Sequence, residues 1–123
     1  MTSDQLIEKI KQGENETFEL KAEVRDPLLL SKLIGSFANN KGGQIVIGVR
    51  EPIEIVGTDA NRLLTIVDRA RTALKPTPNF TTEIITVDNK ELLLLFSRQV
   101  YVDNLKLSYN IWISNYCAMN CIH

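Results

Sequence analysis

Residues 34–57, IGSFANNKGGQIVIGVREPIEIVG, contain the segment around which the rest of the chain is arranged. An apolar helical segment ends near Asn39 and Asn40, and two glycines then lead into the run IVIGV at residues 45–49. This run is too short and too β-branched for a helix, so it predicts a strand that is buried on both faces. Gly48 lies inside the run, where a missing side chain weakens a strand unless another segment packs closely against it. We therefore expect a central strand with a close contact at Gly48.

The composition is typical of a globular protein, and the chain is not strongly basic. The chain has 123 residues, of which 44% are hydrophobic and 24% charged, and this length allows one domain with its own core. The net charge is −1 and the isoelectric point is about 5.8, so phosphate binding would need a local basic surface. We find neither a long apolar run nor a secretory signal, and we expect a cytoplasmic location without a membrane partner.

The first part of the chain predicts a short helix followed by a strand. Thr2 and Gln5 have the spacing of a capping box, and the helix that they begin should end before Gly13. In residues 18–23, apolar side chains alternate with charged ones, which is the pattern of a half-buried strand.

Further along, the pattern predicts two longer helices and a β-hairpin. Asp26 and Pro27 are typical of a helix start, because Asp can cap the helix and Pro needs no hydrogen-bond acceptor there. The predicted elements are a helix over 27–39, a brief strand over 53–57, a helix over 59–74 and a hairpin over 80–96. Together they predict an α+β fold, in which a mixed sheet of five or six strands carries the two longer helices.

The last twenty residues differ in composition from the rest. After Lys106 the chain has no further Lys, Arg, Asp or Glu, and the tail contains several asparagines among aromatic and aliphatic residues. We therefore divide the chain into a domain of residues 1–103 and an atypical tail of residues 104–123. The tail could form a last strand of the domain or pair with a second copy, so a homo-oligomer stays open as an alternative.

Two separated motifs resemble the AlbA-type domain of the Schlafen family. They are GENETFELK at residues 13–21 and FANNKGGQIVIGV at residues 37–49, followed by IVG, and the likeness covers roughly residues 6–96. The resemblance implies a domain that binds DNA or RNA, in a transcriptional regulator or a helicase-related protein. Such domains are also described as divergent ATP-binding modules. The glycines here lack the P-loop spacing and lead into a strand, so the residues themselves support ATP binding only weakly.

An acidic set accompanies these motifs. Carboxylates can hold Mg²⁺ or Mn²⁺, and a nearby lysine can stabilise phosphate charge. Schlafen-type RNA nucleases look similar, so the resemblance implies Glu14, Glu19 and Glu51 as metal ligands, with Lys21 beside them as a further catalytic residue. Arg50 stands where the family commonly has an aspartate, and its charge would oppose a metal ion. The alternative is that Glu19 and Lys21 belong to the solvated face of an edge strand. Whether the chain is an enzyme therefore stays open.

The second candidate set is basic and glycine-rich. Glycines let backbone N–H groups approach phosphate oxygens, and Lys41 adds a positive charge. The alternative is that these glycines only end the preceding helix. Lys21, Lys41 and Arg50 should converge if the strand that begins near Phe18 lies beside the central strand. The candidate nucleic-acid-binding residues are Lys21, Arg25, Asn40, Lys41, Gly42, Gly43 and Arg50.

The sequence thus predicts a nucleic-acid-binding domain as its first function. A divalent-metal-dependent RNA endonuclease of Schlafen type is the alternative, with Mg²⁺ or Mn²⁺ as cofactor; no other cofactor is indicated. A module that oligomerises through its apolar tail is the third reading.

Overall fold

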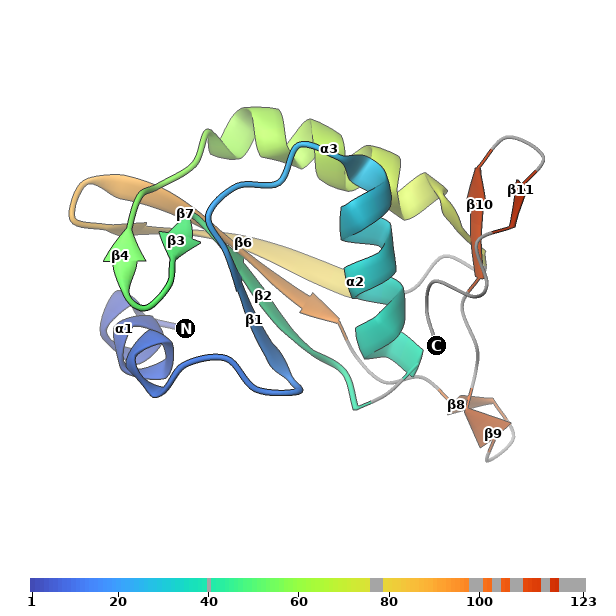
Figure 1. The fold of residues 1–123 in the computed structure, drawn as a ribbon, viewed down its shortest axis with the longest axis horizontal. Helices are drawn as coiled ribbons and strands as arrows, with labels where there is room; N and C mark the ends of the chain where they lie inside the picture. Colours follow the sequence, from blue (N-terminus) through green and yellow to red (C-terminus); the bar gives the residue numbers. More distant parts are fainter. Residues whose placement is uncertain are drawn as a thin grey trace.

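The computed structural model describes residues 1–39, 41–75, 79–97, 101–102, 105–106, 110–113 and 116–117. Its main sheet has four strands in the order β1-β2-β7-β6. β1 and β2 run parallel, and the other neighbouring strands run antiparallel (Figure 1). The bounds are β1 (Phe18–Lys21), β2 (Gly43–Ile47), β6 (Phe80–Val87) and β7 (Lys90–Ser97).

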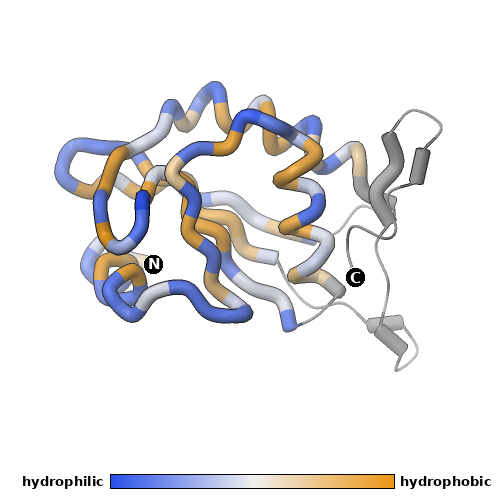
Figure 2. Tube along the Cα trace, in the orientation of Figure 1, coloured by the Kyte–Doolittle hydropathy of each residue, from blue (hydrophilic) through white to orange (hydrophobic). Residues whose placement is uncertain are grey.

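Helices cover both faces of this sheet. The helices are α1 (Ser3–Gln12), α2 (Pro27–Asn39) and α3 (Ala60–Thr72). α2 and α3 pack with Ile45 and Ile47 of β2, whereas α1 packs with Val46, which points to the opposite face. Figure 1 shows α3 along the top of the molecule and α1 at its lower left, and Figure 2 shows hydrophobic segments gathered where the sheet meets the helices. Because β2 is buried on both faces, as predicted, it holds the two core clusters together.

The helix ends form where the sequence predicts them. Thr2 and Gln5 make the capping box at the start of α1, and Gly13, with φ +85°, follows its last turn. Asp26 Oδ1 accepts a hydrogen bond from the N–H of Leu28 at 2.9 Å at the start of α2. These local bonds satisfy N–H groups that have no partner inside a helix.

The predicted close contact at Gly48 is present. Gly48 has φ +115°, and a Cβ atom added to it would lie 2.6 Å from Leu92 Cδ2. Its carbonyl oxygen accepts hydrogen bonds from the N–H groups of Val56 and Gly57, both at 2.9 Å. A side chain is therefore disfavoured here for steric and backbone reasons. The two hydrogen bonds hold Val56 and Gly57, which follow β4 (Glu54–Ile55), against the end of the central strand.

The smaller strands complete an α+β fold, which confirms the predicted class. The main sheet has four strands, fewer than the five or six that we expected, because the remaining described strands form separate small sheets. These strands are β3 (Val49–Arg50) with β4 (Glu54–Ile55), β8 (Tyr101–Val102) with β9 (Leu105–Lys106), and β5 (Leu74–Lys75) with β10 (Asn110–Ile113) and β11 (Tyr116–Cys117).

Two further expectations concern the hairpin and the tail. The predicted hairpin is present, and its turn has two residues, Asp88 and Asn89, both with positive φ. β10 lies within the tail of residues 104–123, and pairing of the tail with a second copy stays a prediction. Among the described residues, none of the helices combines the length and apolarity needed to cross a membrane.

Candidate functional site

The loop before β1 folds back along the outer edge of that strand. β1 is the first strand of the main sheet, so only one of its edges pairs with β2. On the other edge, Asn15 and Phe18 exchange two backbone hydrogen bonds of 3.0 and 3.2 Å. Glu14 Oε2 accepts a third bond from the N–H of Leu20 at 2.8 Å. The loop therefore covers part of the exposed edge and holds the Glu14 carboxylate beside the middle of β1.

Three glutamates from separate segments meet at this edge. Burial raises the pKa of Glu14, but hydrogen bonds from the Glu51 carboxyl and from Leu20 N–H outweigh it, so this pKa lies below its ordinary value. Burial, followed by the hydrogen bond and the charge of Glu14, raises the pKa of Glu19. The hydrogen bond with Glu14, followed by the charge of Glu14, raises the pKa of Glu51. Of the three glutamates, Glu14 therefore loses its proton most readily as the pH rises, and Glu19 and Glu51 lose theirs less readily than ordinary carboxyl groups.

The fourth predicted catalytic residue lies beside this cluster. Lys21 Nζ is 3.4 Å from Glu19 Oε1, and both side chains are about one-third exposed. The structure therefore brings together all four residues of the predicted acidic set: Glu14, Glu19, Lys21 and Glu51.

The arrangement of these glutamates does not fit a bound metal ion. Within the part of the chain that the structure describes, no group of three or more His, Cys, Asp or Glu side chains could hold one. Coordination of Mg²⁺ or Mn²⁺ by Glu14, Glu19 and Glu51 would require them to rearrange, and it stays a prediction.

The predicted basic residues all face an acidic partner. Lys21 pairs with Glu19 of the glutamate cluster described above, and the other three basic residues form pairs that are more exposed. The four pairs and their N···O distances are Lys21–Glu19 (3.4 Å), Arg25–Glu23 (3.0 Å), Lys41–Glu16 (2.6 Å) and Arg50–Glu54 (3.5 Å). Exposed pairs of this kind contribute little to stability, so a phosphate group can replace the acidic partner at small cost.

The expected convergence of Lys21, Lys41 and Arg50 is wrong for Lys41. The two strands are neighbours, as predicted, but they run parallel, with Phe18 opposite Gln44 and Lys21 opposite Ile47. Lys21 thus lies at the end of β2 that leads to Arg50, and Lys41 lies at the other end. Four residues of strand, about 13 Å, separate these two ends. The candidate residues form two groups, one at each end of the β1–β2 pair.

The diglycine bend has a structural role of its own. Gly42 has φ +78°, and its N–H donates to Phe37 O at 2.7 Å, which ends α2. A Cβ atom added to Gly43 would lie 2.8 Å from Thr17 O, so this glycine allows two backbones to approach closely. The alternative interpretation of these glycines as helix-ending residues is therefore supported, and phosphate contact stays a prediction. Asn40 lies outside the described residues.

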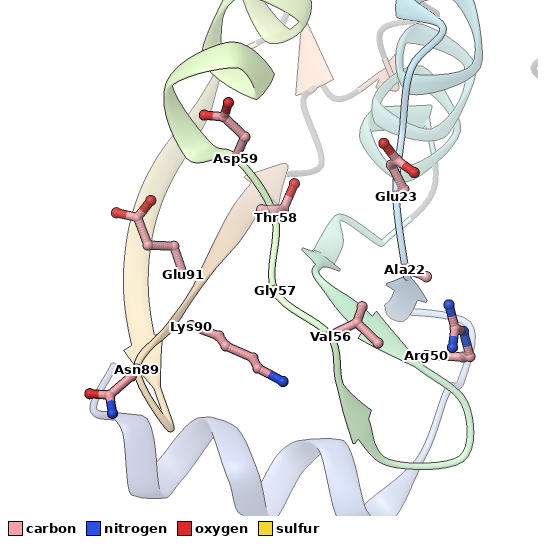
Figure 3. A pocket seen from close by; sticks show the side chains of 10 residues that line it. All are labelled: Ala22, Glu23, Arg50, Val56, Gly57, Thr58, Asp59, Asn89, Lys90 and Glu91. Atoms are coloured by element: carbon pink, nitrogen blue, oxygen red, sulfur yellow. The ribbon is translucent and has the colours of Figure 1, made fainter.

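A polar pocket that the sequence did not indicate lies at the Arg50 end. It has a volume of about 670 Å³ and combines side chains from β3, the start of α3 and the β6–β7 turn (Figure 3). Arg50 and Lys90 lie on either side of the segment around Gly57, and Lys90 Nζ donates to Ile55 O at 3.1 Å. Glu23, Asp59 and Glu91 also line it. The mixture of charges gives this pocket no clear preference for an anion.

A second pocket lies at the diglycine end and has a volume of about 360 Å³. It contains two lysines, one aromatic ring and a buried amide from four different segments. The lining residues are Lys9, Thr17, Lys41, Gly42, Gly43, Gln44, Phe96 and Ser97. Sequence reasoning found three of these residues and missed Lys9, Gln44 and Phe96, because no local pattern connects α1 with the end of β7.

Fold and site together define a small α+β domain with a mixed sheet, a carboxylate cluster at the edge strand and basic groups at both strand ends. A family model described as Schlafen, AlbA_2 matches residues 14–113, and the chain belongs to that family. No curated protein sequence matches the chain.

Two solved structures share the fold. One is the N-terminal domain of an ATP-dependent DNA helicase RecG-related protein from Nitrosomonas europaea, with a TM-score of 0.63 and 15% identity over 82% of this chain and 75% of that one. The other is the DIP2311 protein of Corynebacterium diphtheriae, with a TM-score of 0.53 and 14% identity over 93% of this chain. The chain spans 26% of the length of that second protein.

Proposed function

We propose that this chain is a nucleic-acid-binding domain that contacts DNA or RNA mainly through phosphate groups, within a transcriptional regulator or a helicase-related protein. The observation that carries the proposal is the family match over residues 14–113. The fold shared with the N-terminal domain of a DNA-helicase-related protein supports it.

The charge distribution decides what kind of binding to expect. With a net charge of −1, the chain has no excess of positive charge to hold a polyanion from a distance. Its candidate cations lie in ion pairs at the protein surface, where phosphate can compete with Glu16, Glu23 or Glu54. Binding should therefore be of modest affinity, directed at the backbone and sensitive to salt.

The test is a binding titration at two salt concentrations. Single-stranded and double-stranded DNA and RNA of one sequence are each labelled and titrated with the protein. We expect binding at low salt that weakens as salt rises. Absence of binding to all four nucleic acids at low salt would contradict the proposal.

A second candidate function is metal-dependent RNA cleavage. The meeting of Glu14, Glu19 and Glu51 at one edge favours it, on condition that the three carboxylates rearrange to bind the metal ion. The test is incubation of structured RNA with the protein and either Mg²⁺ or Mn²⁺. Glu19→Ala should abolish cleavage, and Glu8→Ala on the exposed side of α1 is the matched control. Cleavage that survives in Glu19→Ala at the unaltered rate would rule out this assignment.

A further inference from the structure

The pocket at the diglycine end lies where α1 leaves the sheet uncovered. On β7, Leu92 and Leu94 pack with α1 in the core and are fully buried. Phe96 continues the same face two residues later, but it is only partly buried and lines the pocket. The volume of about 360 Å³ lies within the range that small ligands occupy, about 300–1,000 Å³.

Two lysines reach this pocket from different segments. Lys9 comes from α1, and its Nζ lies 5.2 Å from the centre of the Phe18 ring. Among the described residues it forms no ion pair, unlike the neighbouring Lys11, which pairs with Glu8. Lys41 comes from the bend after α2 and pairs with an exposed glutamate. The pocket therefore has one lysine without a carboxylate partner and a second whose partner an anion can replace.

One residue that lines the pocket has a buried polar atom without a hydrogen-bond partner among the described residues. Gln44, directly opposite Phe96 in the β2–β7 pairing, is 5% exposed. Its Oε1 atom has no hydrogen-bond partner among the described residues. A buried amide oxygen without a donor is unfavourable, and such groups in native proteins commonly have a functional reason. A ligand with an amino group at this position would supply the missing donor.

We propose that this pocket binds one nucleotide unit of a single-stranded nucleic acid, with its phosphate between Lys9 and Lys41 and its base against Phe96. The amide of Gln44 then faces the polar edge of the base. This inference rests on the proposed nucleic-acid-binding function and names the form of the ligand. A single strand is required because a base in a duplex has to leave its stack before it can contact an aromatic side chain in a pocket.

The phosphate contact is tested by the salt dependence of binding. A short single strand and the corresponding duplex, each as DNA and as RNA, are titrated with wild-type protein, Lys9→Ala and Lys11→Ala. The two variants lose the same charge from the same helix, so they lower the general electrostatic attraction equally. For the single strand, Lys9→Ala should reduce the slope of log K against log salt by about 0.7, the value for one phosphate contact, whereas Lys11→Ala should retain the wild-type slope.

The base contact is tested at Phe96. Phe96→Leu keeps an apolar side chain and removes the aromatic face, so single-strand binding should weaken about fivefold to hundredfold. Phe96→Tyr should bind more tightly than Phe96→Leu because it restores the ring. Ile55→Val is the control for packing, since Ile55 is partly buried against the same core cluster but lies outside the pocket. Thermal unfolding of each variant shows whether the fold is intact.

The outcomes separate this inference from the function on which it rests. If the wild-type protein binds nucleic acid but Lys9→Ala and Lys11→Ala have equal slopes, or Phe96→Leu and Phe96→Tyr bind equally, the pocket assignment is wrong and the proposed function stands. Tighter binding of the duplex than of the single strand would also overturn it. If no nucleic acid binds at low salt, the proposed function itself fails. The DNA and RNA arms show which sugar the site accepts.

Discussion

Glu14 accepts a hydrogen bond from the backbone N–H of Leu20 across six residues of sequence, with its Oε2 atom 2.8 Å from the nitrogen. This bond satisfies a donor on the outer edge of β1, where no further strand follows. An unpaired strand edge can recruit another chain, and proteins commonly cover it. The glutamate that the family resemblance assigns to chemistry thus also closes the edge of the sheet.

Replacement of Glu14 separates these two roles. Glu14→Ala removes the acceptor and leaves the Leu20 N–H without its partner, so the free energy of unfolding should fall by about 1–3 kcal/mol. Glu14→Gln keeps an oxygen in the same place and should lose clearly less. Chemical denaturation of both variants measures the difference. Equal losses in the two variants would mean that the hydrogen bond to Leu20 does not stabilise the fold.

Because the pKa values of Glu19 and Glu51 are raised, the ionised forms of these two carboxyl groups should destabilise the folded protein at neutral pH. A carboxyl group whose pKa rises on folding costs stability when it is ionised, and this cost disappears as the pH falls below its ordinary pKa. Glu14 has a lowered pKa, so it stabilises the fold above its ordinary pKa and this contribution is lost in acid. Glu51→Gln should therefore raise the melting temperature at pH 7.

The pH dependence provides the control for that experiment. The gain from Glu51→Gln should shrink as the pH falls towards the ordinary carboxyl value of 4.5, because the raised pKa of Glu51 lets it take up its proton in the folded state at a higher pH than in the unfolded chain. Glu91→Gln, at an exposed position on β7, removes the same charge away from the cluster. A melting temperature that Glu51→Gln lowers at pH 7, or a gain that Glu91→Gln reproduces, would contradict an unfavourable interaction between the ionised carboxylates of Glu51 and Glu14.

Local sequence patterns predicted the elements well and their relative placement only in part. The apolar stripe and the Asp26-Pro27 start gave α2 its observed bounds of Pro27–Asn39, because both signals act within a few residues. The prediction that Lys41 lies beside Lys21 was wrong. The order strand, helix, strand favours a parallel pair, and in a parallel pair Lys21 and Lys41 lie at opposite ends. Lys9 and Phe96 could not be joined from sequence, since 87 positions separate them and only packing of α1 on the sheet brings both to one pocket.

The stability cost of a side chain at Gly48 can be compared with the cost at a second glycine, Gly13. Gly48→Ala places a Cβ atom 2.6 Å from Leu92 Cδ2 in a backbone conformation that disfavours side chains. Gly13→Ala also carries a backbone cost, of about 1–3 kcal/mol at φ +85°, but no heavy atom lies within 4 Å of its added Cβ. Gly48→Ala should therefore destabilise the protein by about 1–3 kcal/mol more than Gly13→Ala. Denaturant titrations of the two variants give this difference directly, and equal losses would mean that the Leu92 side chain can move away from Gly48 at little cost.

Replacement of Gln44 tests whether its side chain binds a ligand or stabilises the fold. Gln44→Leu replaces a buried acceptor without a donor by an apolar side chain, so the free energy of unfolding should stay the same or increase. Ser97→Ala is the comparison, because Ser97 lies next to Phe96 at the same sheet end and its Oγ donates to Ile34 O at 3.3 Å. That variant should lose about 0.5–1.5 kcal/mol of stability.

Gln44→Leu should also bind a single strand more weakly than the wild-type protein does, since the base edge loses its polar partner in the pocket. Replacing a residue that serves the fold lowers the stability of the protein. A ligand-binding group inside a core can instead destabilise the ligand-free protein, so its replacement need not lower stability. A Gln44→Leu variant that is less stable than wild type, with single-strand affinity unaltered, would show that the amide serves the fold and not a ligand.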